Sequence, residues 1–219
     1  MIALPRLIAL APVALLFASC SSAPHATRMN SSLLSGAPKE VKAPVNIARS
    51  EVAVAQDALA NAQKQAKNAA EATGLAQQEL NVAMAKVDQA RVQAVIAERA
   101  ATAEESQAAK AAYAKIIETA AIARLGLALS KRERDVAQLR ERLAQEELGL
   151  VAANLELATG RAIDGLDLPA ADAVSVEDLR SEVSFQAAEV EAMVKRLGAA
   201  RVEMEKARGA YENAIAKAR

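Results

Sequence analysis

Hydrophobic residues recur at alternating spacings of three and four from Val45 to Thr159, a stretch that contains no proline. Residues three and four apart share one face of a helix, so this spacing indicates a long helix with one buried stripe. A heptad register fits without a slip, and only Thr73 and Lys115 interrupt its apolar first position, a. The a residues are Val45, Val52, Leu59, Ala66, Thr73, Leu80, Val87, Ala94, Ala101, Ala108, Lys115, Ile122, Leu129, Val136, Leu143, Leu150 and Leu157.

The fourth position of this register, d, is alanine throughout its first half. These residues are Ala48, Ala55, Ala62, Ala69, Ala76, Ala83, Ala90 and Ala97. Small side chains at d let two helix backbones approach more closely than leucine would. After Ala97 the d positions become mixed and include Glu104, Glu118 and Arg132, which indicates a narrower seam or a different partner.

A second helical pattern follows a predicted loop over 160–174. Gly160, Gly165 and Pro169 favour ending the first helix near Thr159. Ser175 then fits an N-cap, and the three-four spacing resumes to predict a helix over about 175–218. Its stripe is Val176, Leu179, Val183, Gln186, Val190, Met193, Leu197, Ala200, Met204, Ala207, Tyr211, Ala214 and Ala218. A loop between two such stripes predicts an antiparallel hairpin.

One helix boundary stays open near 102–106, where Thr102 and Glu105 have the spacing of a capping box. A break there would give three helices of about 55, 55 and 43 residues in a bundle. We favour one continuous helix over about 45–159, because the segment lacks glycine and proline and the heptad phase continues across it. The alanine seam would then need a partner from another chain. Both organisations are all-α: a long antiparallel helical hairpin or coiled coil, or a three-helix bundle.

Composition agrees with rods rather than with a compact enzyme. The 219 residues are 53% apolar, but 56 of them are alanine and only 2% are aromatic, so large side chains for a core are scarce. The 27 basic and 27 acidic residues balance, which argues against a nucleic-acid partner.

The first 19 residues have the pattern of a signal peptide. Arg6 precedes an apolar run over 7–17, which is too short to span a membrane. The sequence Phe17-Ala18-Ser19-Cys20 then resembles the lipobox of bacterial lipoproteins. That resemblance implies cleavage before Cys20 and its modification by diacylglycerol and a further acyl chain such as palmitate. The alternatives are an ordinary signal peptide with an incidental cysteine, or a buried free thiol.

Residues 20–43 are predicted to be the lipidated N-terminus and a flexible tether, because they are rich in Ser, Ala and Pro. Ser21 follows the cysteine in place of the aspartate that retains lipoproteins at the inner membrane. For an envelope with two membranes, the resemblance therefore implies the periplasmic face of the outer membrane. His25 lies in this tether without a second His or an Asp nearby, so we expect no metal site there. The helical domain is then expected over 44–219.

Two short segments add family resemblances. Cys20-Ser21-Ser22 and Ala85-Lys86-Val87-Asp88-Gln89 resemble murein lipoproteins, which implies a lipid-anchored coiled coil and peptidoglycan as a partner. That family is linked through a C-terminal lysine, whereas this chain ends Lys217-Ala218-Arg219. The segment 155–161, followed by 166–169, is similar to the helix ends of outer-membrane efflux channels.

The predicted mature chain has no phosphate-binding loop, cysteine pair or His–acid cluster, so we expect no enzyme, catalytic residue, cofactor or metal site. The pairs Lys131–Asp135, Arg142–Glu146, Glu191–Lys195 and Arg201–Glu205 are expected on solvated helix faces. Tyr113 is a candidate contact residue, and Tyr211 is expected to pack in its stripe.

The sequence thus predicts a lipid-anchored structural or scaffold protein of the bacterial envelope. Its expected partners are the membrane, through the lipid on Cys20, and either itself or another envelope protein, through a helical seam. The alternative is a periplasmic accessory subunit of a transport or export complex.

Overall fold

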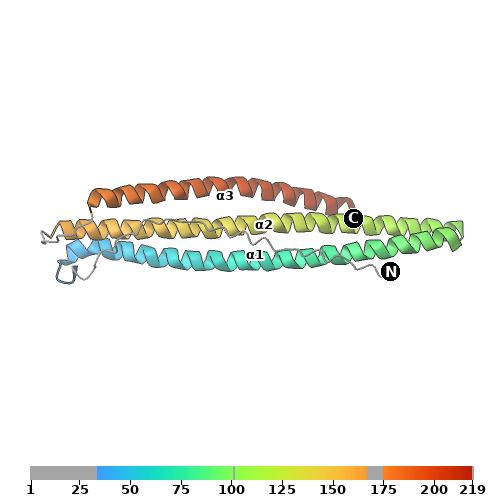
Figure 1. Ribbon diagram of the computed structural model, residues 1–219, viewed down its shortest axis with the longest axis horizontal. Helices are drawn as coiled ribbons and strands as arrows, with labels where there is room; N and C mark the ends of the chain where they lie inside the picture. Colours follow the sequence, from blue (N-terminus) through green and yellow to red (C-terminus); the bar gives the residue numbers. More distant parts are fainter. Residues whose placement is uncertain (1–33, 101, 167–174, 219) are drawn as a thin grey trace, which may run out of the picture.

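The computed structural model describes residues 34–100, 102–166 and 175–218 and consists of long helices. They are α1 (Lys39–Ala100), α2 (Ala103–Asp164) and α3 (Val176–Ala218), and the described ranges contain no strand. Figure 1 shows the helices side by side, with α2 between α1 and α3. The predicted all-α class is confirmed. At 1.5 Å per residue, the two 62-residue helices are each about 93 Å long.

The preferred continuous helix over 45–159 is wrong, because the chain reverses at Thr102. Thr102 has extended backbone angles (φ −65°, ψ 162°) and caps α2. Its hydroxyl accepts a hydrogen bond from the Glu105 N–H (3.3 Å), and its own N–H donates to the Glu105 carboxylate (2.8 Å). This reciprocal capping box satisfies donors that a new helix start would otherwise leave free. The three-helix alternative was the right one.

The seam of α1 is occupied by α2 from the same chain. Every predicted a and d position from Val45 to Ala97 is buried or partly buried, and nearly all other α1 side chains after Lys42 are exposed. Ser130 of α2 hydrogen-bonds Thr73 of this seam, so the seam packs on the side of α2 that carries Ser130. The expectation that the alanine seam needs another chain is therefore wrong.

The heptad phase that continues past Thr102 belongs to a different interface. Gly126 of α2 lies against the Tyr211 ring of α3, with the position of an added Cβ 3.3 Å from the ring. The Arg208 guanidinium of α3 is 3.5 Å from the Glu133 carboxylate of α2. Gly126 and Glu133 are three and four residues from Leu129, a predicted a position, so the α3 contact lies beside this part of the predicted stripe. The predicted positions are covered only farther along α2, because Glu104, Ala108, Ala111, Lys115 and Glu118 are exposed.

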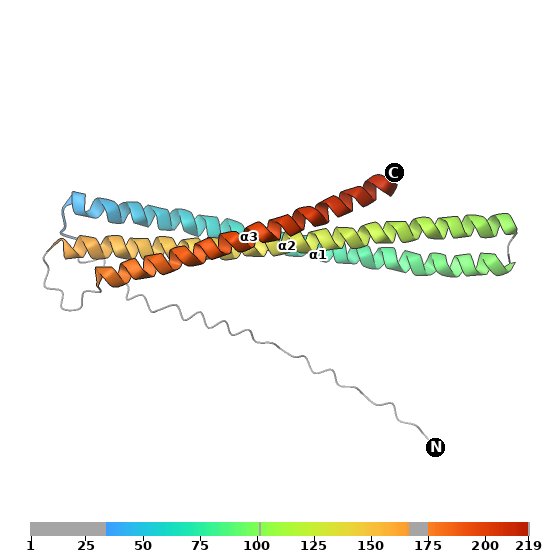
Figure 2. The same cartoon turned by 90° about the horizontal axis from the view of Figure 1, so that it is seen from above.

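The α3 stripe is confirmed from Val176 to Ala214, where each predicted position is buried or partly buried; Ala218 is exposed. α3 packs antiparallel on α2, and α1 and α3 lie on opposite sides of α2 (Figure 1). Figure 2 shows that α3 runs obliquely along α2 and that the α1–α2 hairpin extends past the end of α3. The three helices therefore form an open arrangement with α2 in the middle and only a marginal contact between α1 and α3.

At the open end of the hairpin, two predicted boundaries are wrong: the end of the tether at residue 43 and the start of the loop at residue 160. Leu34 and Val45 form a buried cluster with Ala162 and Ile163 of α2. Burial of Ala162 and Ile163 offsets the cost of Gly160, about 1 kcal/mol within a helix, so α2 continues to Asp164 instead of ending at 159. α1 begins at Lys39 and includes Pro44, so residues 39–43 are helical and not part of a tether.

A polar contact lies within the otherwise apolar seam. The Thr73 hydroxyl donates to the carbonyl of Ala69 (2.8 Å) and approaches that of Ser130 (3.1 Å). The Ser130 hydroxyl donates to the Thr73 Oγ1 (3.2 Å), and both side chains are buried. Because a shifted register would bury these hydroxyls without partners, the pair favours one alignment of α1 on α2.

We predict that Thr73→Val lowers the free energy of unfolding by about 1–2 kcal/mol, because Ser130 loses its acceptor. The double variant Thr73→Val/Ser130→Ala should lose less than the sum of the two single variants, since neither hydroxyl is then left unpaired. Urea unfolding followed by circular dichroism measures the free energy of unfolding of the unaltered protein, the two single variants and the double variant. Strictly additive losses would contradict the coupling.

Candidate functional site

The predicted lipidation residue Cys20, the signal peptide over 1–19 and His25 all lie outside the described residues. Among the residues that the structure describes, no group of three or more His, Cys, Asp or Glu side chains could hold a metal ion. None of the described helices combines the length and the apolar character needed to cross a membrane.

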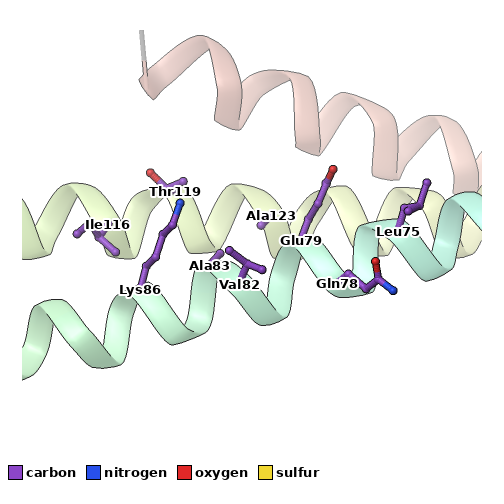
Figure 3. A pocket seen from close by; sticks show the side chains of 9 residues that line it. All are labelled: Leu75, Gln78, Glu79, Val82, Ala83, Lys86, Ile116, Thr119 and Ala123. Atoms are coloured by element: carbon purple, nitrogen blue, oxygen red, sulfur yellow. The ribbon is translucent and has the colours of Figure 1, made fainter.

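A groove between α1 and α2 opens beside the C-terminal end of α3 (Figure 3). Its volume is about 620 Å³. It is lined by Leu75, Gln78, Glu79, Val82, Ala83 and Lys86 of α1 and by Ile116, Thr119 and Ala123 of α2. The groove exists because alanines at Ala83 and Ala123 leave space between the backbones that larger residues would fill.

The groove has an apolar floor and a charged rim. In Figure 3 the Lys86 and Glu79 side chains extend from α1 toward α2 on either side of Val82 and Ala83. Lys86 ends near Thr119 in this view. Methyl and aliphatic surface framed by two opposite charges suits an aliphatic side chain from another helix.

A stripe of uncharged side chains runs along α1 and borders this groove. It consists of Ile47, Val54, Asn61, Asn68, Leu75, Val82, Gln89 and Ile96, which recur every seven residues. We call it the outer stripe. Its five aliphatic members are 56–69% exposed, and its three amides are exposed as well.

Sequence reasoning missed the outer stripe because it followed only the a and d positions. The signal was present at the third heptad position, c, which holds no charge from Ile47 to Ile96 although Lys, Arg, Asp and Glu occur throughout the rest of α1. Exposed faces of soluble helices normally carry those charges. An uncharged column seven residues apart is instead typical of a second contact face.

The tip of the hairpin, where α1 ends and α2 begins, is held by two polar contacts. Beside the capping box, the Lys110 ammonium is 2.8 Å from the Glu98 carboxylate across the two helices. This hydrogen bond and the charge of Lys110 lower the pKa of Glu98. Hydrogen bonds from the N–H and then the hydroxyl of Thr102 lower the pKa of Glu105 below its ordinary value of 4.5.

We predict that the tip loosens in acid. A pKa that is lower in the folded state stabilises the fold above the unfolded value of 4.5, and this stabilisation is lost as pH falls through the folded value. Hydrogen-exchange protection of the amides of Glu105 and Ser106 should therefore fall below about pH 4.5. Glu105→Gln should remove most of this pH dependence, whereas Glu71→Gln, on an exposed part of α1, should leave it unchanged. Protection that is constant down to pH 3 would contradict the role of the cap.

The remaining residues singled out in the sequence lie on the surface or in the helix interfaces. The Glu191–Lys195 pair is confirmed at 2.6 Å, and Tyr211 packs in its stripe against Gly126 as predicted. Asp135 is near Arg132 (3.7 Å) and Arg134 (3.8 Å). Tyr113 is partly buried on the α1-facing side of α2, 17 residues before Ser130. None of these contacts joins the groove.

Comparisons with protein-family models, with curated proteins and with solved structures find no match to this chain.

Proposed function

We propose that the protein is a lipid-anchored, non-enzymatic structural protein of the bacterial envelope. It holds a helical hairpin at the periplasmic face of the outer membrane and acts through contacts of its helices. The observation that carries this proposal is a hairpin about 93 Å long with an uncharged outer stripe, preceded in the sequence by the lipobox-like Cys20.

The position of the chain start suits this role. α1 begins at the end of the hairpin opposite to the tip (Figures 1 and 2). An anchor at Cys20 would therefore attach to the open end, and the tip would be the part farthest from the attachment point. Thirteen residues lie between Cys20 and Leu34, which limits the link to about 46 Å at about 3.3 Å for each residue step.

The alternative proposal is an accessory subunit that docks its tip on a transport or export complex. It is favoured by Val92, Val95 and Ile96, which are 43–60% exposed on the last turns of α1. Cross-linking from the tip in membranes distinguishes the two proposals. A stoichiometric transporter subunit favours docking, whereas products of this chain alone favour the structural role.

We predict that Cys20→Ser abolishes palmitate incorporation and moves the protein from the membrane fraction to the soluble fraction. The reason is that the cysteine sulfur carries the diacylglycerol, and two or more acyl chains are needed for durable anchoring. Radiolabelled palmitate and fractionation at high salt measure both effects.

Ser22→Ala is the matched control, since it alters a neighbouring small residue and leaves the sulfur in place. It should keep both the label and the membrane association. A Cys20→Ser protein that stays in the membrane fraction would overturn the anchor.

A further inference from the structure

We infer that two copies of the chain associate in parallel and in register through the outer stripe of α1. The stripe is accessible, because all eight of its side chains are exposed. Its aliphatic members Val54, Leu75 and Ile96 are 69%, 61% and 60% exposed. Such a continuous uncharged line has no partner among the described helices.

The stripe offers enough surface for a stable dimer. From Ile47 to Ile96 it extends about 75 Å at 1.5 Å per residue, and a helix contact is about 10 Å wide. The contact would bury about 750 Å² on each chain, close to the roughly 800 Å² per partner of standard protein interfaces.

The order of residues in the stripe favours parallel pairing. In register, each aliphatic residue meets its own copy, and the amides of Asn61, Asn68 and Gln89 meet amides. Amides paired within such a seam form hydrogen bonds and fix the register. An antiparallel pairing centred on the stripe would instead set Asn68 against Leu75 and Asn61 against Val82, which leaves amides facing apolar groups.

The flanks of the stripe allow close approach. Charges lie along both edges of the stripe, where long side chains can keep them in water: Glu51, Glu79 and Lys86 on the side of the groove, and Asp57, Lys64, Glu71 and Arg99 on the other side. The apolar groove next to Leu75 and Val82 can receive aliphatic side chains of the second copy. Parallel order also suits two chains anchored to one membrane, but the pairing of like residues does not depend on the anchor.

Single cysteines in the full chain carrying Cys20→Ser test this arrangement, because each introduced thiol is then the only one. Under mild oxidation, Val54→Cys, Leu75→Cys and Val82→Cys should each give a disulfide-linked dimer in at least tenfold higher yield than Ala70→Cys. Ala70 is exposed but lies five residues from Leu75, about 140° around the helix.

Mixing Asn68→Cys with Leu75→Cys chains tests the direction. Parallel pairing separates these positions by two turns, so the mixed dimer should be absent. A dominant Asn68–Leu75 product would overturn the parallel order, and yields equal to that of Ala70→Cys would overturn the interface. Because Cys20 is replaced in all these chains, the result is independent of the lipid anchor.

Light scattering of charge variants provides a second measurement. The Cys20→Ser chain should have twice the mass of one chain, and adding Leu75→Glu and Val82→Glu should halve it. Helicity should not change, because both side chains are more than half exposed. Ala70→Glu, the matched control, should keep the dimer mass. A monomer mass before the glutamates are introduced would overturn the proposal.

Discussion

The close packing of α1 on α2 through the alanine seam is the interaction on which the rest of the molecule depends. Alanine at every d position of α1 gives each layer little apolar area, so the seam must be long to be stable. Repeating the contact over two 62-residue helices supplies that length. The capping box at Thr102 serves this packing, because it begins α2 directly after α1 and so lets the chain reverse within a few residues.

The second constraint is that α2 has two apolar faces, whereas α1 has one seam and a separate outer stripe. α2 contacts α1 through Ser130 and contacts α3 through Gly126 and Glu133. Because α3 packs mainly on α2, it has only a marginal contact with α1. The arrangement stays open, and the outer stripe and the groove at Ala83 remain accessible (Figures 1 and 3).

These features link the fold to the proposed role. This open arrangement encloses little volume, and Val45 is the large side chain that it buries most completely among the described residues. The surface that it offers is linear, with an uncharged edge on α1 and an exposed apolar tip at Val92, Val95 and Ile96. Linear contact surfaces suit an envelope protein that binds other helices at a distance from its anchor.

The sequence by itself determined the all-α class, the a and d positions of α1 and the stripe of α3, because helical periodicity is a local property of the chain. It also contained the capping box, but the unbroken heptad phase outweighed that signal. Only the tertiary structure decided which helix each stripe faces, because an apolar stripe predicts that a helix face is buried but does not identify the helix that covers it. For the same reason, the partner of the alanine seam, the helical continuation through Gly160 and the open groove required α2 to be placed in space. The outer stripe could be found in the sequence as a heptad position without charges, but its exposure could be established only from the positions of the other helices.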